Sequence, residues 1–177
     1  MTTAVRIARQ WVGYLEHKDR ALLFVYRANT GKGGCTAFAQ IISEQYRWRN
    51  FQRMPWCAVF VHAVYIMAFG KKRAAALLGK PHPGTRVLRR RMRRYGRWRG
   101  RDYVPAPGDI IFCNNTRDGC VSHCGIVEAV SGGKVYSIEG NTVDPSGVFP
   151  ENQGGAVARR ERDKDDPCIV GYASIKE

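Results

Sequence analysis

The sequence has no hydrophobic run of the roughly 18 residues that a helix needs to cross a bilayer. Its first residues are amphipathic and lack the apolar block of a secretory signal. We therefore expect no membrane span. The chain is used where it is made, leaves by another route, or is a fragment of something longer.

Internal repeats and low-complexity linkers are also missing, so nothing in the sequence marks a second domain. The chain has 177 residues, of which 44% are hydrophobic and 25% charged, as in a globular protein with a real core. We expect one domain over residues 1–177, with a helical part at about 3–95 and a sheet part at about 108–174.

Acidic residues are scarce: 15 Asp and Glu face 29 Lys and Arg, which gives a net charge of +14. This excess predicts an acidic partner such as a wall polymer, a nucleic acid or an anionic lipid. No zinc-finger, zipper or RNP-type signature supports nucleic acid. The six cysteines are irregularly spaced, which favours reduced thiols over a disulfide set.

The stretch from Met54 to Phe69 predicts a central, buried helix, because it is apolar nearly all round. Pro55 suits the first helical position, which places Cys57 in the first turn. Free N–H groups and the helix dipole there lower a thiol pKa and favour the thiolate. The alternative is an ordinary buried cysteine.

Further helices are predicted over 3–16 and about 35–47, and a basic section follows at 71–101. In this section Thr85 can cap a helix whose arginines fill most positions outside a buried stripe. No acidic residue occurs between Arg73 and Arg101. The section is either a solvated helix face or a face that binds polyanions.

After Pro107 the pattern changes to short β-branched runs, predicting strands at 109–113, 122–130, 134–139, 155–159 and 169–173. Helices first and antiparallel strands afterwards indicate an α+β domain. Gly132 and Gly133 predict a tight hairpin, in which His123 should lie beside Glu139 to Asn141 on the neighbouring strand. A thiol, an imidazole and an orienting group form the general arrangement for covalent catalysis by cysteine.

Four motifs in this order resemble the CHAP family, the cysteine, histidine-dependent amidohydrolases/peptidases of the papain-like superfamily, which also holds the NlpC-type cell-wall peptidases. The resemblance covers roughly residues 5–173. The motifs are Pro55-Trp56-Cys57-Ala58-Val59-Phe60-Val61, Pro107-Gly108-Asp109-Ile110-Ile111-Phe112, Ser122-His123-Cys124-Gly125-Ile126-Val127-Glu128 and Ile138-Glu139-Gly140-Asn141-Thr142.

The resemblance implies a papain-like fold, with the nucleophile on a central helix packed on an antiparallel sheet of about five strands. It implies peptidoglycan hydrolysis, by an amidase or an endopeptidase, with Cys57 as nucleophile and His123 as acid and base. Glu139 matches the third catalytic position, and Asn141 assists in orientation or polar contact. The expected substrate is a stem peptide or cross-bridge, and we expect the chain to act on it as a monomer at the bacterial cell wall. The chain would reach the wall through a phage-, holin- or effector-type route, or as part of a larger secreted protein.

Candidate substrate contacts are Trp56, Gln52, Arg89, Arg90 and Arg93, with Gln52 also a candidate for the oxyanion hole. Some family members bind calcium through an acidic loop upstream of the nucleophile. The corresponding loop at 29–34 has no carboxylate, so we expect neither calcium dependence nor any other cofactor.

Two alternatives remain. Several cysteines near His123 could hold a structural zinc, but adjacent residues on a strand point to opposite faces, so we expect Cys113 and Cys124 to be core thiols behind the sheet. The chain could also be a non-catalytic module that binds a polyanion or the cell wall through its Arg-rich 86–101 face.

Overall fold

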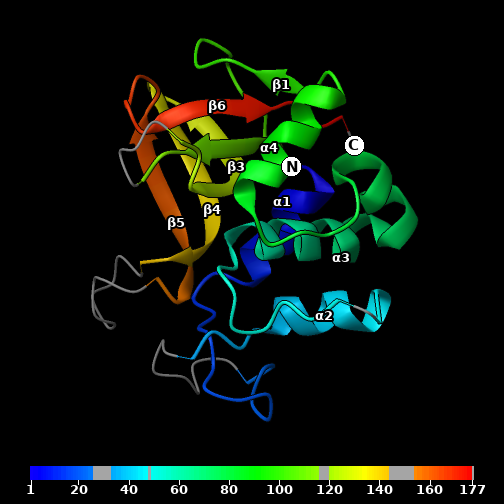
Figure 1. The fold of residues 1–177 in the computed structure, drawn as a ribbon. Helices are drawn as coiled ribbons and strands as arrows, with labels where there is room; N and C mark the ends of the chain where they lie inside the picture. Colours follow the sequence, from blue (N-terminus) through cyan, green and yellow to red (C-terminus); the bar gives the residue numbers. More distant parts are fainter. Residues whose placement is uncertain (26–32, 48, 116–119, 144–153, 177) are drawn as a thin grey trace.

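We describe the chain from a computed structural model, in which all residues except 26–32, 48, 116–119, 144–153 and 177 are described. Within that part, the chain forms four helices and one antiparallel six-stranded sheet (Figure 1). The predicted α+β class is therefore correct. The elements are α1 (Thr3–Gln10), α2 (Ala37–Gln45), α3 (Cys57–Leu78), α4 (Thr85–Arg94), β1 (Trp98–Arg99), β2 (Ile110–Cys113), β3 (His123–Ser131), β4 (Lys134–Thr142), β5 (Ala156–Asp163) and β6 (Ile169–Ala173).

The helix α3 is the centre of the molecule and contacts α1, α2, α4, β3 and β4. Its first ten residues are all buried, as its all-round apolar sequence predicts. Gly70, with a φ of 74°, interrupts α3 close to the predicted end, and the chain continues helically to Leu78. The nucleophile candidate thus begins the most buried element of the fold.

The sheet has the order β1-β6-β2-β3-β4-β5. Strands β3 and β4 form the predicted hairpin, in which Gly132 and Gly133 have φ values of 57° and 77°. Two successive positive φ angles define a type I′ turn, which glycine adopts at little cost. The hairpin crosses the middle of the structure and carries both His123 and Glu139.

A β-bulge in β3 determines which side chains of the hairpin share a face. Near the turn, Ser131 pairs with Lys134, but beyond the bulge Ile126 pairs with Ile138. The register therefore shifts by one residue, and its continuation places His123 level with Asn141. Without the shift, Glu139 would point to the opposite face from His123.

Glu128 lies at this bulge and is held by two arginines. Arg9 of α1 donates to its carboxylate at 2.6 Å, and Arg159 of β5 does so at 2.9 Å. Side chains from α1 and β5 thus hold Glu128, the extra residue of the bulge, in place. This ion pair supports the register that the site needs.

Several element boundaries differ from the predictions. The pattern predicts a helix over 3–16, but α1 ends at Gln10, because Gly13 has a φ of 89° and Leu15 bridges to Ala156 of β5. Tertiary strand pairing overrides the helical pattern there. The short strand β1 was not predicted, because Trp98 and Arg99 were read as part of the basic section.

Other differences are smaller. Pro55 precedes the N-cap Trp56 rather than occupying the first helical position. Strand β5 extends to Asp163, four residues beyond its predicted end. Part of the predicted loop at 29–34 lies outside the described residues. Among the described residues, no helix is both long and apolar enough to cross a membrane.

Candidate active site

Cys57 is the first residue of α3 and is 3% exposed. The N–H groups of a first helical turn have no partners within the helix, so the sulfur lies where a negative charge is stabilised. Its Sγ is 3.3 Å from Oγ1 of Thr85. The sequence suggests Thr85 as a helix cap, but Gly84 is the N-cap of α4 and the Thr85 side chain contacts Cys57 instead.

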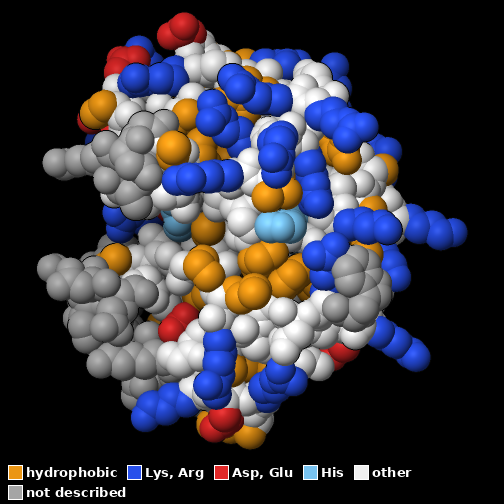
Figure 2. Space-filling view, viewed as in Figure 1, with side chains coloured by type: hydrophobic (Ala, Val, Ile, Leu, Met, Phe, Trp, Pro, Cys, Tyr) orange, Lys and Arg blue, Asp and Glu red, His pale blue; other side chains and the backbone are white. Residues whose placement is uncertain are grey.

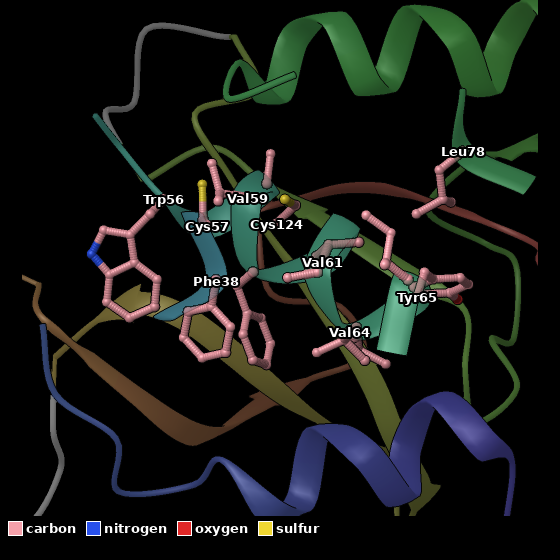
Figure 3. Close-up of a cluster of buried hydrophobic side chains, with 14 of the residues drawn as sticks. Phe38, Trp56, Cys57, Val59, Val61, Val64, Tyr65, Leu78 and Cys124 are labelled. Atoms are coloured by element: carbon pink, nitrogen blue, oxygen red, sulfur yellow. The ribbon is translucent and has the colours of Figure 1, made fainter. Parts of the chain in front are cut away.

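Trp56 fixes the start of α3 in the core. Its indole Nε1 donates to Glu16 at 2.7 Å, and its ring stacks on Phe38 with centroids 5.6 Å apart (Figure 3). The side chain is 1% exposed. The structure therefore shows Trp56 as a support for the helix, and the predicted substrate contact stays untested.

His123 and Glu139 form a buried pair on the hairpin. The ring Nε2 of His123 is 2.8 Å from Oε2 of Glu139, and both side chains are less than a tenth exposed. Gly125 makes this contact feasible, because a Cβ at that position would lie 2.5 Å from Cγ of Glu139. The missing side chain of Gly125 leaves the space through which Glu139 reaches His123.

Glu139 is fully buried, and Arg162 of β5 compensates its charge. Arg162 donates to both carboxylate oxygens, and Ser137 donates to Oε1 at 2.6 Å. Burial raises the pKa of Glu139, but the charges of His123 and Arg162 outweigh it and hold that pKa below its ordinary value. Arg162 was missed, since it lies in a strand of alternating charge that reads as exposed.

The His123 ring lies close enough to the Cys57 thiol for each group to shift the pKa of the other. Burial lowers the pKa of His123, but the Glu139 carboxylate and the hydrogen bonds to Cys57 and Glu139 raise it to about 10. Since Nε2 faces Glu139, Nδ1 is left for the thiol. The lowered pKa of Cys57 and the raised pKa of His123 both favour a thiolate beside an imidazolium.

Cys124 is a second thiol at this site. Its hydrogen bond to Cys57 is the main reason that the pKa of Cys57 lies well below its ordinary value; the His123 ring and Thr85 act in the same direction, and burial opposes them. Cys113 and Cys124 are both fully buried core thiols, as predicted, but they do not lie together behind the sheet. Cys124 packs in the core that contains α3, whereas Cys113 packs on the other face of the sheet.

A groove of about 420 Å³ opens at Cys57. It runs between the start of α3, the start of α4 and the segment before β3. Mostly apolar residues line it, which suits a substrate held along the thiol. The lining residues are Met54, Pro55, Cys57, His82, Pro83, Gly84, Thr85, Arg86, Val121 and Ser122.

The remaining predicted residues lie around this centre. Asn141 is half-buried, has a φ of 56°, and is level with His123 in the hairpin register. The Gln52 amide hydrogen-bonds both backbone groups of Thr36, at 2.7 and 3.0 Å, so its oxyanion role stays a prediction. Arg89, Arg90 and Arg93 line a neighbouring cavity rather than the groove.

No group of three or more His, Cys, Asp or Glu side chains that could hold a metal ion occurs among the described residues. Cys113 instead hydrogen-bonds Cys168 on the far face of the sheet. All six cysteines are free thiols.

A nucleophile at a helix N-terminus, facing a histidine on a sheet, is the layout expected of a papain-like domain. The chain belongs to the CHAP domain family, whose model matches residues 25–141. Its fold is similar to the crystal structure of Ly7917 with the hydrolyzing product of MDP, with a TM-score of 0.51 and 14% identity. That alignment covers 98% of this chain and 61% of the other. A search of curated proteins found no match.

Proposed function

We propose that this chain hydrolyses an amide bond of peptidoglycan by covalent cysteine catalysis at the bacterial cell wall. The observation that carries the proposal is the buried His123–Glu139 pair, whose ring interacts with the Cys57 thiol at the start of α3. Family membership supports peptidoglycan hydrolysis at the family level. The substrate is a stem peptide or a cross-bridge, and the chain acts as a monomer.

In the first half of the reaction, the Cys57 thiolate attacks the amide carbonyl carbon. Backbone N–H groups of the first turn of α3 stabilise the oxyanion that forms. The His123 imidazolium then gives its Nδ1 proton to the departing amine, and an acyl-enzyme thioester remains. Glu139 keeps the ring oriented and stabilises its positive charge, while Asn141 adds a polar contact beside it.

In the second half, the neutral His123 ring takes a proton from water. The resulting hydroxide attacks the thioester carbon, and the Cys57 thiolate leaves as the carboxylic acid product forms. The proton ends on His123, so the starting pair is restored.

Digestion of purified peptidoglycan, followed by mass spectrometry of the fragments, tests this function. We expect new amino termini and carboxylates at one type of amide bond, and none with Cys57→Ala. Cleavage between muramic acid and L-alanine defines an amidase, and cleavage within the stem or cross-bridge defines an endopeptidase. Unchanged peptidoglycan would refute the proposal.

The activated thiol gives a second test that needs no substrate. At about pH 6 an ordinary thiol, with a pKa near 8.5, is almost wholly protonated and reacts slowly with iodoacetamide. Because the pKa of Cys57 is lowered, we expect it to alkylate there much faster than Cys120, and His123→Gln to shift its labelling to higher pH. The rate of hydrolysis should also decrease as the pH approaches 10, because His123 then loses the proton that it gives to the departing amine.

A non-catalytic wall- or polyanion-binding module is the second candidate, and the arginines of α4 favour it. Such a module has no need of an activated thiol. If Cys57 labelling follows that of Cys120 across the pH range, the catalytic proposal fails and the binding module remains.

A further inference from the structure

A second cavity, of about 250 Å³, lies directly beside the catalytic groove. Four arginines, Cys120 and Val121 line it. Two of its lining residues, Arg86 and Val121, also line the groove that contains Cys57, and Arg86 Nε donates to the Val121 carbonyl at 3.4 Å. The two hollows therefore share a wall.

Three of the four arginines of this cavity have no acidic partner among the residues that the structure describes. Arg89, Arg90 and Arg93 form no ion pair with a carboxylate in the described part of the chain, and α4 contains no acidic residue. Figure 2 shows basic side chains gathered over α4, beside the hydrophobic surface of the groove. Burial and, after it, the charge of Arg93 lower the pKa of Arg89, and an anion placed here would favour the charged guanidinium.

Two of the guanidinium groups are held in place. Those of Arg89 and Arg93 lie over the Trp98 ring, at 4.8 and 5.8 Å from its centroid. The Nε atom of Arg89 is buried without a hydrogen-bond partner in the protein. Stacked guanidinium groups lose less freedom on binding and present a planar fork that matches a carboxylate or phosphate.

We propose that these arginines form an oxyanion subsite that holds a carboxylate of the wall peptide, a few bonds from the amide that Cys57 attacks. The assignment of the ligand rests on the proposed function. A carboxylate is favoured over a phosphate of a wall polymer, because the cavity shares its wall with the groove and is therefore within reach of another part of a peptide bound there. The subsite would set substrate specificity and act on KM.

Binding of inorganic pyrophosphate, measured by calorimetry on the whole chain, tests the cavity without any turnover. We expect the double variant Arg89→Gln/Arg93→Gln to weaken this binding by about tenfold or more, since hydrogen bonds to charged groups are lost. Arg6→Gln/Arg94→Gln removes the same charge from exposed positions outside the cavity and should change binding by less than about twofold. Equal losses, or no binding by the parent chain, would overturn the subsite.

The ligand is tested with two wall peptides that differ only by a carboxylate or a carboxamide next to the cleaved bond. For the parent chain, we expect the carboxamide to raise KM by about tenfold with little change in kcat. In Arg89→Gln/Arg93→Gln this difference should disappear, while Arg6→Gln/Arg94→Gln keeps it.

Two other results would overturn the carboxylate assignment. One is an equal KM for both peptides with the parent chain. The other is competition by poly(glycerol phosphate) that depends on Arg89 and Arg93, which would assign the cavity to a phosphate polymer. Failure of all cleavage would refute the proposed function instead, since pyrophosphate binding does not depend on it.

Discussion

At the scale of single residues, the site is a chain of contacts from Arg162 through Glu139 and His123 to Cys57. Each member compensates the charge of the next inside a protein interior, where an unpaired charge is costly. Arg162 touches neither the thiol nor the groove, so we regard it as a positioning residue. Its effect on the reaction passes through the Glu139 carboxylate.

Replacing Arg162 by methionine should therefore affect both stability and catalysis. Loss of one partner of a buried ion pair costs on the order of 3 kcal/mol, so we expect a lower free energy of unfolding in urea titrations. Without the Arg162 charge the pKa of Glu139 rises, and the acid limb of the rate profile should move to higher pH, with kcat reduced more than KM.

Arg160→Met is the matched control, because Arg160 lies on the same strand but does not contact Glu139. It should leave the pH profile in place. The double variant Glu139→Gln/Arg162→Met should recover part of the lost stability, since it leaves no unpaired buried charge. If Arg162→Met keeps the parent pH profile, Arg162 has only a structural role.

Cys57, His123 and Glu139 could be found from the sequence, because each depends on a local pattern: a helix start, a strand start and a hairpin count. Arg162, Thr85 and Cys124 could not be assigned their contacts in the same way. Each reaches the site from an element whose face is set by tertiary packing. Thr85 in particular looks like a helix cap until α3 and α4 are placed side by side.

At the scale of elements, catalysis needs α3 and the hairpin to approach closely. Gly140 of β4 allows this, because a Cβ there would lie 2.6 Å from Cβ of Phe60 and 2.7 Å from the Trp56 ring. Both of these side chains are fully or almost fully buried, so neither can move without disturbing the core. The close approach of α3 to β4 therefore depends on the absence of a side chain at Gly140.

We expect Gly140→Ala to push the start of α3 away from β4. Overpacking of this kind costs about 1–3 kcal/mol, and the displaced Cys57 should lower the hydrolysis rate more than the loss of folded protein explains. Gly100→Ala is the control, because nothing lies within 4 Å of its added methyl group. Thermal unfolding and initial rates on soluble muropeptide would measure both effects. Parent-like rates in Gly140→Ala would show that the site tolerates the shift.

The hairpin shows why the sequence predicts which strands pair better than it predicts where a bulge interrupts the pairing. Counting residues from Gly132 places His123 level with Asn141, as does extension of the observed register beyond Ile126 and Ile138, although the turn is centred between Gly132 and Gly133. The bulge at Glu128 accounts for the difference of one residue. Its position depends on Arg9 and Arg159, which come from other elements, so local pattern alone does not reveal it.

At the scale of the whole molecule, the net charge of +14 acts over distances longer than any single contact. We expect Cys57→Ala to bind anionic whole sacculi, and this binding to weaken steeply as salt shortens the screening length from about 10 Å at 0.1 M. Co-sedimentation across a salt series measures it. Salt-independent binding would instead indicate recognition by the groove alone.

The same experiment separates the general charge from the proposed subsite. Arg6→Gln/Arg94→Gln and Arg89→Gln/Arg93→Gln remove equal charge and should weaken sacculus binding to a similar extent. Only the second variant should change KM for a small peptide.

The Glu139–Arg162 ion pair also bears on where this chain can be shortened. The family match ends at residue 141, and truncation there would retain Cys57, His123 and Glu139. It would remove Arg162 with β5, and it would also remove β6, which lies between β1 and β2 inside the sheet. We therefore expect a minimal active fragment to extend through Ala173, well beyond the last residue of the proposed catalytic set.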